Sequence, residues 1–273
     1  MTIPYAEVIG DPIAHSKSPL IHGLWLKQLG LPFDYRRTRV VAEDLGAYFD
    51  RRRADPDWRG CNITIPHKIA AIAHVDSCDS GEVGAINCVV PEGAGLRGLN
   101  SDVLGLVEAL QACDANGPAV LLGTGGAARA ALAWMAGAGV SEIRILARDR
   151  AKAEQLLQAF DAPGRVFGLD AADDALAGAA GLLNATPMGM DGFDPVPEAV
   201  LTALQGLRPN GFVLDMVYVP VDTLLLQRAR AAGLIPVDGL AMLIGQAKSA
   251  FRLFFGTNPP AAGDAELRAI LTS

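Results

Sequence analysis

Short apolar runs alternate with segments of helical periodicity along the first part of the chain. Apolar residues ending at Gly10 predict a first strand, and the segments after Pro19 and around Leu45 predict helices. Further strands are predicted at 33–40, 60–65 and 87–90, and the last is followed by a glycine-rich turn at 93–95 and a return of the chain to Asn100. Strands that alternate with helices are typical of βαβ units and favour a mainly parallel sheet.

A helix with a marked apolar stripe is predicted after Ser101. Its apolar residues recur at i, i+3, i+4 and i+7, namely Val103, Leu106, Val107 and Leu110. Ser101 stands at the N-cap position, where a hydroxyl accepts a hydrogen bond from the first turn. We expect this helix to connect two domains.

From Pro118 the pattern becomes that of a nucleotide-binding fold. An apolar strand at 119–122 precedes a glycine-rich turn and an alanine-rich helix at 127–137. Later strands are predicted at 142–147, 181–184 and 211–215. From Asp238 the sequence predicts a long amphipathic helix and then a short helix from Ala262. The predicted fold class is therefore α/β, with a Rossmann-type unit in the middle of the chain.

Length and charge narrow the classes of protein that fit this pattern. The 273 residues favour two domains or one large α/β domain. Thirty acidic and 23 basic residues give a net charge of −7, which argues against a nucleic-acid partner. No apolar run approaches the roughly 18 to 20 residues of a membrane span, and residues 1–7 do not resemble a secretory signal. A cytoplasmic protein without a membrane partner is expected, whereas the oligomeric state is not predicted.

Cysteine and histidine positions do not suggest a metal site. The four cysteines contain no CxxC pair, and free thiols are expected. The four histidines contain no i, i+4 pair with an acidic residue between them. We therefore predict that the protein binds no metal.

The glycine-rich turn has the arrangement of a dinucleotide-binding loop. Gly123, Gly125, Gly126, Ala127 and Ala128 lie between the strand and the helix. Glycines there let the backbone approach a pyrophosphate, and the helix N-terminus stabilises its charge. An ordinary tight turn is the alternative, but the flanking strand and helix favour cofactor binding.

Basic residues follow the second strand of this unit. An NAD-selective fold usually has an acidic residue there, to bind the ribose 2′-hydroxyl. This chain has Arg148, with Lys152 one turn later, and both can bind a 2′-phosphate. These basic residues predict NADP as the cofactor. Asp149 lies between them and could repel a phosphate, so NAD stays the alternative.

Several polar residues of the flanking segments are candidates for substrate chemistry. Lys68 is predicted in the first turn of a helix that follows Pro66, where the positive end of the helix dipole suits it to proton transfer. Ser18 looks like an N-cap before Pro19, and a small carboxylate could also meet the hydroxyls of Ser16 and Ser18. A surface lysine and ordinary capping residues are the alternatives.

Two further polar residues belong to predicted helices. Asp102 is predicted in the first turn of its helix, where an acidic residue is favoured in any case. Gln246 falls on the apolar face of the last long helix, so its amide needs either backbone groups or a ligand hydroxyl as partner.

In combination, these residues resemble the shikimate dehydrogenase family over nearly the whole chain. The matching motifs are His15–Pro19, Asn62–Lys68, Gly84–Asn87, Asn100–Asp102, Gly123–Ala128, Asn184–Gly189, Asp215–Tyr218 and Asp238–Leu243. The resemblance implies a substrate domain of residues 1–101 completed by helices of 238–273, and a dinucleotide domain of 102–237. It also implies NADP-dependent, reversible reduction of 3-dehydroshikimate to shikimate, a step of chorismate and aromatic amino acid biosynthesis.

The resemblance also implies roles for individual residues. Lys68 and Asp102 would be the catalytic pair, and Ser16 and Ser18 would bind the substrate carboxylate. The remaining substrate contacts would come from Thr64, Asn87, Tyr218 and Gln246. The nicotinamide side of the cofactor site would include Thr186, Met188 and Gly239.

Three positions depart from the family pattern near the expected substrate. Cys88 and Ser101 each replace a threonine, and Ala241 replaces a glycine. Quinate or an amino-substituted relative of shikimate is therefore an alternative substrate. A catalytically weak regulator is a further alternative, which the presence of both Lys68 and Asp102 disfavours. Folate and amino-acid dehydrogenases, which have a similar inserted dinucleotide domain, are less expected alternatives because they would not need the paired serines.

Overall fold

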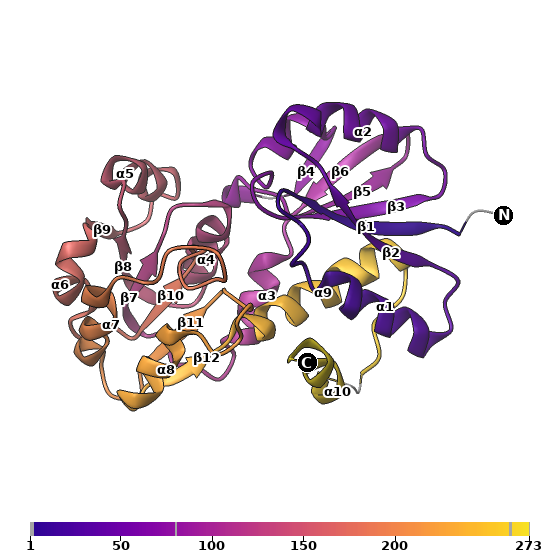
Figure 1. Ribbon diagram of the computed structural model, residues 1–273. Coiled ribbons are helices and arrows are strands. Elements are labelled where there is room, and N and C mark those ends of the chain that lie inside the picture. The colour runs from indigo at the N-terminus through magenta and orange to yellow at the C-terminus, as the bar shows by residue number, and fades with distance from the viewer. Residues whose placement is uncertain (1–2, 80, 262–263, 273) are drawn as a thin grey trace. The chain divides into compact units, whose positions relative to one another are not determined.

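The computed structural model describes residues 3–79, 81–261 and 264–272. The chain forms two compact units, one made of Met1–Gly105 with Leu243–Ser273 and the other of Leu106–Met242. We call these unit 1 and unit 2. Both combine a sheet with helices, so the fold is two-part α/β as predicted (Figure 1). The expected domain boundaries, after residues 101 and 237, lie a few residues before those of the compact units.

Unit 1 contains a mixed sheet in the order β2-β1-β3-β5-β6-β4. Its strands are β1 Tyr5–Gly10, β2 Asp34–Arg39, β3 Trp58–Ile63, β4 Ser77–Asp79, β5 Cys88–Glu92 and β6 Gly95–Leu99. Strand β1 pairs in parallel with β2 and β3, whereas β5 pairs antiparallel with β3 and β6. The pairing of β3 with β5 places Asn62 opposite Cys88, which brings Asn62 close to Asn87.

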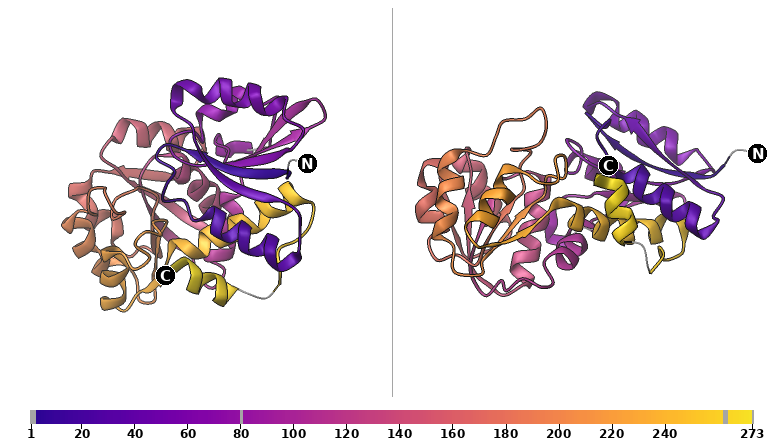
Figure 2. Two further views of the ribbon diagram at one scale, coloured as in Figure 1. Left: turned by 45° about the vertical axis from the view of Figure 1, so that its right-hand side comes forward. Right: turned by 60° about the horizontal axis from the view of Figure 1, so that its bottom comes forward.

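Helices cover both faces of this sheet. They are α1 Ser18–Leu29, α2 Leu45–Arg53, the first part of α3 Asp102–Ala109, most of α9 Gly239–Phe255, and α10 Asp264–Thr272. Short 3-10 helices are η1 Ala42–Asp44, η2 Ala70–His74 and η3 Gly81–Val83. Helix α2 lies on one face and α1 on the other (Figures 1 and 2).

Because side chains alternate along the strands, the two faces of the sheet pack against different sets of side chains. Tyr5 and Ile9 of β1 pack with Tyr48 and Phe49 of α2. On the opposite face, rings of α1, β2 and α9 form an aromatic cluster around His22. Burial of these aromatic and aliphatic side chains is the main stabilising contribution to the unit.

Unit 2 contains a parallel sheet in the order β12-β11-β10-β7-β8-β9, the strand order of a Rossmann fold. Its strands are β7 Gly117–Leu122, β8 Val140–Leu146, β9 Gly164–Phe167, β10 Gly181–Asn184, β11 Phe212–Asp215 and β12 Ile235–Val237. Its helices are α4 Gly126–Gly137, α5 Arg150–Ala159, α6 Ala172–Leu176, α7 Glu198–Ala203 and α8 Leu224–Ala231, with the 3-10 helices η4 Leu169–Ala171 and η5 Leu204–Gly206.

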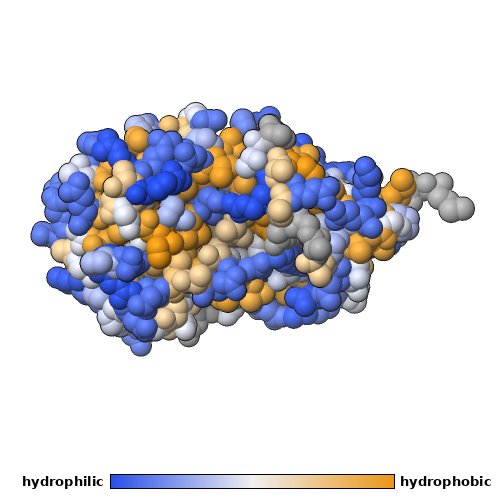
Figure 3. Space-filling view, turned by 90° about the horizontal axis from the view of Figure 1, so that it is seen from below, coloured by the Kyte–Doolittle hydropathy of each residue, from blue (hydrophilic) through white to orange (hydrophobic). Residues whose placement is uncertain are grey.

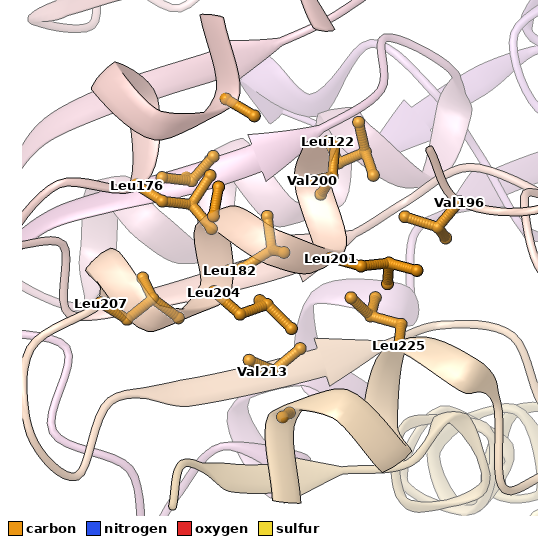
Figure 4. Close-up of a cluster of buried hydrophobic side chains, with 14 of the residues drawn as sticks. Leu122, Leu176, Leu182, Val196, Val200, Leu201, Leu204, Leu207, Val213 and Leu225 are labelled. Atoms are coloured by element: carbon orange, nitrogen blue, oxygen red, sulfur yellow. The ribbon is translucent and has the colours of Figure 1, made fainter. Parts of the chain in front are cut away.

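A leucine- and valine-rich cluster joins this sheet to α6, α7 and α8 (Figure 4). Leu122, Leu182 and Val213 point from neighbouring strands toward Leu201 and Leu225 of the helices. Helix α4 packs on the other face, where Trp134 meets Phe212 edge to face. The sheet is thus buried on both sides, as a parallel sheet requires.

Three strands and two local details differ from the predictions. The short strands β4, β9 and β12 were not predicted, and each lies at an edge of its sheet, where few residues are buried and the apolar pattern is weak. Helix α1 has Lys17 at its N-cap, so Ser18 is the first helical residue and not the cap. Strand β3 ends at Ile63, which leaves Ile65 55% exposed and outside the expected alternation.

The surface carries both hydrophilic and hydrophobic side chains. On the face seen in Figure 3, hydrophilic side chains are spread widely, with hydrophobic side chains between them. Among the described residues, no helix is long and apolar enough to cross a membrane.

Candidate active site

Lys68 and Asp102 form a buried ion pair in unit 1. The Lys68 Nζ lies 2.5 Å from the Asp102 Oδ2, and their side chains are 15% and 5% exposed. An ammonium beside a carboxylate in a mostly dry environment can give a proton to a substrate oxygen or accept one from it. The structure therefore brings together the two residues that were predicted to form a pair.

The local structure around Lys68 differs from the prediction. Lys68 lies in a turn and is followed by the 3-10 helix η2, not in the first turn of an α-helix. The argument from a helix dipole therefore does not apply to it. The turn is held by hydrogen bonds from His67 N to Thr64 O (3.0 Å) and from Ile86 N to Lys68 O (2.8 Å).

Asp102 begins helix α3, as predicted. Its backbone N donates to the Asn100 Oδ1 at 2.9 Å, which orders the start of the helix. The hydroxyl of Ser101, the expected cap, lies 3.2 Å from the Gln246 Oε1 and 3.3 Å from the Asn87 Oδ1. Ser101 thus joins a side-chain network around Asp102.

Asn87 is the centre of this network. Its Nδ2 donates to the Asp102 Oδ1 at 2.8 Å and lies 3.0 Å from the Ser101 Oγ. Its Oδ1 accepts from Ser101 N at 2.7 Å. With only two N–H groups, the amide makes a weaker contact to the Gln246 Oε1, at 3.4 Å. Asn87 thereby fixes the carboxylate oxygen that Lys68 does not bind.

Gln246 is buried on α9 as predicted and is 7% exposed. Its Nε2 donates to Leu243 O at 3.1 Å, and its Oε1 accepts from Ser101. Both a backbone group and side chains therefore satisfy the amide.

Ser16 and Ser18 lie together at the start of α1. Their hydroxyls are 3.3 Å apart, and Ser18 N donates to the Ser16 Oγ at 3.4 Å. The residues are 7% and 4% exposed. Arg37 Nε donates to Ser16 O at 2.8 Å and holds this segment in place.

Thr64 follows the end of β3 and is half-buried. Its N donates to Ile9 O at 2.9 Å, so it continues the ladder with β1. A β-carbon at Gly10 would lie 2.5 Å from the Thr64 methyl group, and only glycine permits this approach. Thr64 therefore lies against Gly10, at the C-terminal end of β1.

The sequence did not identify Asn62 and Tyr35 as part of this region. The Tyr35 hydroxyl donates to the Asn62 Oδ1 at 2.6 Å, and the Asn62 Nδ2 donates to Asn87 O at 3.3 Å. A signal was available, because Asn62 is a polar residue within a predicted strand, and an amide that is buried there needs partners.

The glycine-rich loop of unit 2 has the predicted geometry. Gly123 follows β7 with a φ of 113°, and a β-carbon there would lie 2.6 Å from the Thr186 methyl group. Nothing lies within 4 Å of the β-carbon position of Gly125, so this part of the loop is open. Helix α4 begins at Gly126, and Ala128 in its first turn is fully buried. Open backbone before a helix N-terminus suits a pyrophosphate.

The loop after β10 lies beside this turn, at the point where the strand order reverses. Asn184 organises it: its Oδ1 accepts from the Thr186 N at 3.0 Å and Oγ1 at 2.7 Å, and its Nδ2 donates to Met188 O at 3.2 Å. Asn184 Nδ2 also donates to the Asp215 Oδ1 at 2.9 Å. Dinucleotides bind at such switch points.

Burial raises the pKa of Asp215 from 3.8 to about 6. Hydrogen bonds from Thr223, Val217 N and Asn184 oppose that rise. Asn184 and Asp215 are the last residues of β10 and β11. The resemblance implied that the segment Asn184–Gly189 edges the nicotinamide, but no role was predicted for Asp215.

Arg148 and Lys152 lie where β8 ends and α5 begins, and both are exposed. Asp149 between them is the N-cap of α5, and its Oδ1 accepts from Lys152 N at 3.0 Å. Its carboxylate is therefore engaged in capping. In the described part of the chain, neither basic side chain forms an ion pair that would compete with a phosphate.

Tyr218 and Gly239 belong to unit 2. Tyr218 is half-buried in the segment after β11. Gly239 begins α9, and a β-carbon there would lie 2.6 Å from Val217 O and 2.7 Å from Met216 O. Gly239 therefore permits close packing on the backbone that precedes Tyr218. Within the described residues, no group of three or more His, Cys, Asp or Glu side chains could hold a metal ion.

Residues 8–89 match the family model described as the shikimate dehydrogenase substrate binding domain. A shikimate dehydrogenase (NADP(+)) of Sphingopyxis alaskensis is 49% identical over 275 residues, covering 99% of this chain and 97% of the relative. One of Mesorhizobium japonicum is 42% identical, covering 98% and 95%.

A crystal structure of shikimate 5-dehydrogenase from Thermus thermophilus, in complex with NADP(H) and shikimate, superimposes with a TM-score of 0.84 at 34% identity. The match covers 98% of this chain and 99% of that one. With relatives this similar over nearly its whole length, this chain belongs to the shikimate dehydrogenase family.

Proposed function

We propose that this protein catalyses the NADP-dependent, reversible reduction of 3-dehydroshikimate to shikimate by hydride transfer. The observation that carries the proposal is the buried Lys68–Asp102 ion pair, held in the Asn87 network of a chain from this family. The reaction belongs to chorismate and aromatic amino acid biosynthesis.

Lys68 and Asp102 are the proposed catalytic pair. In reduction, the Lys68 ammonium donates a proton to the substrate carbonyl oxygen as hydride reaches the carbonyl carbon. In oxidation, neutral Lys68 accepts the hydroxyl proton. Asp102 orients the lysine through the 2.5 Å contact between Oδ2 and Nζ. The nicotinamide, when bound, supplies or accepts the hydride.

The remaining residues of unit 1 are proposed to bind the substrate. The adjacent hydroxyls of Ser16 and Ser18 suit a carboxylate, because each can donate one hydrogen bond. Thr64, Asn87 and Gln246 would bind ring hydroxyls. Tyr218 of unit 2 is proposed to complete this set.

The proposed cofactor site lies in unit 2. The open backbone at Gly123, Gly125, Gly126, Ala127 and Ala128 fits a pyrophosphate. Arg148 and Lys152 would bind the 2′-phosphate, which favours NADP over NAD. Thr186, Met188 and Gly239 would edge the nicotinamide. The proposal includes the division into a substrate domain (1–101 with 238–273) and a dinucleotide domain (102–237).

Quinate and aminoshikimate stay alternative substrates because of Cys88, Ser101 and Ala241. Cys88 is fully buried, and Ser101 keeps a hydroxyl bonded to the network. The hydroxyl that Ser101 keeps in the network around Asp102 supports shikimate as the preferred substrate. A cytoplasmic location and the lack of nucleic-acid or membrane partners stay predictions from the sequence.

A panel of initial-rate assays tests the proposal. Purified protein is assayed with shikimate, quinate and aminoshikimate, each with NADP⁺ and with NAD⁺. We expect the highest kcat/KM for shikimate with NADP⁺. A higher value for another substrate would reassign the substrate, a higher value with NAD⁺ would overturn the role of Arg148, and no turnover with any pair would overturn the reaction.

A further inference from the structure

Tyr35 of β2 lies beneath the proposed substrate site without reaching its surface. The residue is 6% exposed, and its hydroxyl donates to the Asn62 Oδ1 at 2.6 Å. Burial raises the pKa of this hydroxyl well above its ordinary value, so it remains a protonated donor at neutral pH. The hydrogen bond from Tyr35 to Asn62 is therefore retained at neutral pH.

Asn62 links Tyr35 to the proposed catalytic pair. Its Nδ2 donates to Asn87 O at 3.3 Å, and the Asn87 amide donates to Asp102 at 2.8 Å. The Tyr35 hydroxyl is therefore connected, through Asn62 and Asn87, to the carboxylate of Asp102.

The ring of Tyr35 is fixed by His22. The two rings are stacked, with centroids 4.1 Å apart and planes 7° apart. His22 is fully buried, and neither ring nitrogen has a hydrogen-bond partner among the described residues. Burial lowers the pKa of His22 to about 3, so the ring is neutral and serves as a flat packing surface.

We propose that Tyr35 is a positioning residue of the substrate site, whose hydroxyl orients Asn62 while its ring is held against His22. This inference rests on the proposed function. It assigns Tyr35 an effect on substrate binding, exerted through Asn62 without contact with the substrate.

Tyr35→Phe is the direct test, because it removes only the hydroxyl. We expect the KM for shikimate to rise about tenfold, since a buried acceptor loses its donor. The kcat and the KM for NADP⁺ should stay within about twofold. Tyr48→Phe is the matched control: it removes another buried hydroxyl of unit 1, which donates to the Glu7 Oε1 at 2.9 Å, and should leave the KM for shikimate unchanged.

Two further variants separate positioning from general loss of structure. Asn62→Ala should reproduce the rise in KM, and the Tyr35→Phe/Asn62→Ala double variant should be no worse than Asn62→Ala alone. His22→Phe should keep the KM within about twofold, because its ring nitrogens bind nothing among the described residues.

The proposal is overturned if Tyr35→Phe leaves the KM for shikimate unchanged, if kcat and both KM values change together, or if the two substitutions are additive. Should Tyr35→Phe not fold, Asn62→Ala decides alone, and an unchanged KM refutes the inference. An inactive parental protein refutes the proposed function and this inference together, whereas an active parental protein with an unaffected Tyr35→Phe refutes only the inference.

Discussion

The Nδ2 of Asn87 lies 2.8 Å from the Oδ1 of Asp102, the carboxylate oxygen that Lys68 does not bind. The carboxylate is therefore held from both sides and has little rotational freedom. An oriented carboxylate keeps Lys68 in one position, which proton transfer to a substrate oxygen requires.

Asn87→Ala removes one side of this arrangement. Asp102 Oδ1 and Ser101 N both lose their buried partner, so kcat/KM for shikimate should fall by about ten- to a hundredfold. Steady-state kinetics measures this. The exposed residue Asn116 provides the control, and a fall no larger than that of Asn116→Ala would contradict the role of Asn87.

Lys68→Ala removes the proposed acid and base. The kcat should fall by about 10² to 10⁴, the usual contribution of a positioned proton-transfer group. Lys27→Ala, at an exposed position of α1, is the matched control and should keep full activity. Near-parental kcat in a folded Lys68→Ala variant would exclude Lys68 as the essential acid.

Arg148→Ala tests the choice of cofactor. Loss of a charge-assisted hydrogen bond to the 2′-phosphate should raise the KM for NADP⁺ by about ten- to a hundredfold. The KM for NAD⁺ should hardly change, because NAD⁺ has no phosphate there. Arg228→Ala serves as the control, since Arg228 is exposed on α8 and paired with Glu198. Equal effects on both cofactors would argue against a phosphate contact.

Glu7→Gln should destabilise unit 1 without affecting catalysis. Glu7 is fully buried on β1 and accepts from the Arg52 Nε at 2.6 Å, from the Tyr48 hydroxyl at 2.9 Å and from the Thr38 hydroxyl. Loss of the carboxylate charge leaves the mostly buried Arg52 without its ion-pair partner, which should lower the free energy of unfolding by about 3 kcal/mol. Thermal unfolding should show a lower Tm, whereas Glu43→Gln, at an exposed position, should not.

Asp215 should make stability depend on pH. Burial raises its pKa from 3.8 to about 6, so the fold favours the neutral carboxyl. The resulting stabilisation, about 3 kcal/mol, is fully present below the unfolded pKa of about 4 and is lost as pH rises through about 6.

Asp215→Asn cannot titrate and should lose this dependence. The difference in Tm between the parental protein and the variant should therefore favour the parental protein more at pH values near the unfolded pKa, about 4, than at pH values well above the folded pKa, about 6. Thermal unfolding at a series of pH values measures it. A difference that is constant over this range would show that Asp215 is ionised in the same way in both states.

Local features of the sequence were enough to predict most of unit 2. The strand at 119–122, the glycine-rich turn and the following helix were predicted and are present as β7, the loop and α4. Such signals depend on neighbouring residues, because strand alternation, helical periodicity and glycine turns are local properties. The edge strands β9 and β12 of this unit, like β4 of unit 1, carry no such pattern and were missed.

The residues around Lys68 show where local reasoning ends. The segment after Pro66 reads as the start of a helix, but it forms a turn and a 3-10 helix held partly by Ile86. Asn62 and Tyr35 meet only because β1 pairs with both β2 and β3, and neither partner is visible from the neighbouring sequence.

By itself, the sequence determined the α/β class, the glycine-rich turn between β7 and α4 and, through the order of its motifs, the family. The tertiary structure alone decided which polar groups satisfy one another: Asn87 with Gln246, from 159 residues away, and Tyr35 with Asn62. The physical reason is that secondary structure follows from interactions between near neighbours, whereas a buried polar group must find its partner wherever the strand register and helix packing place one.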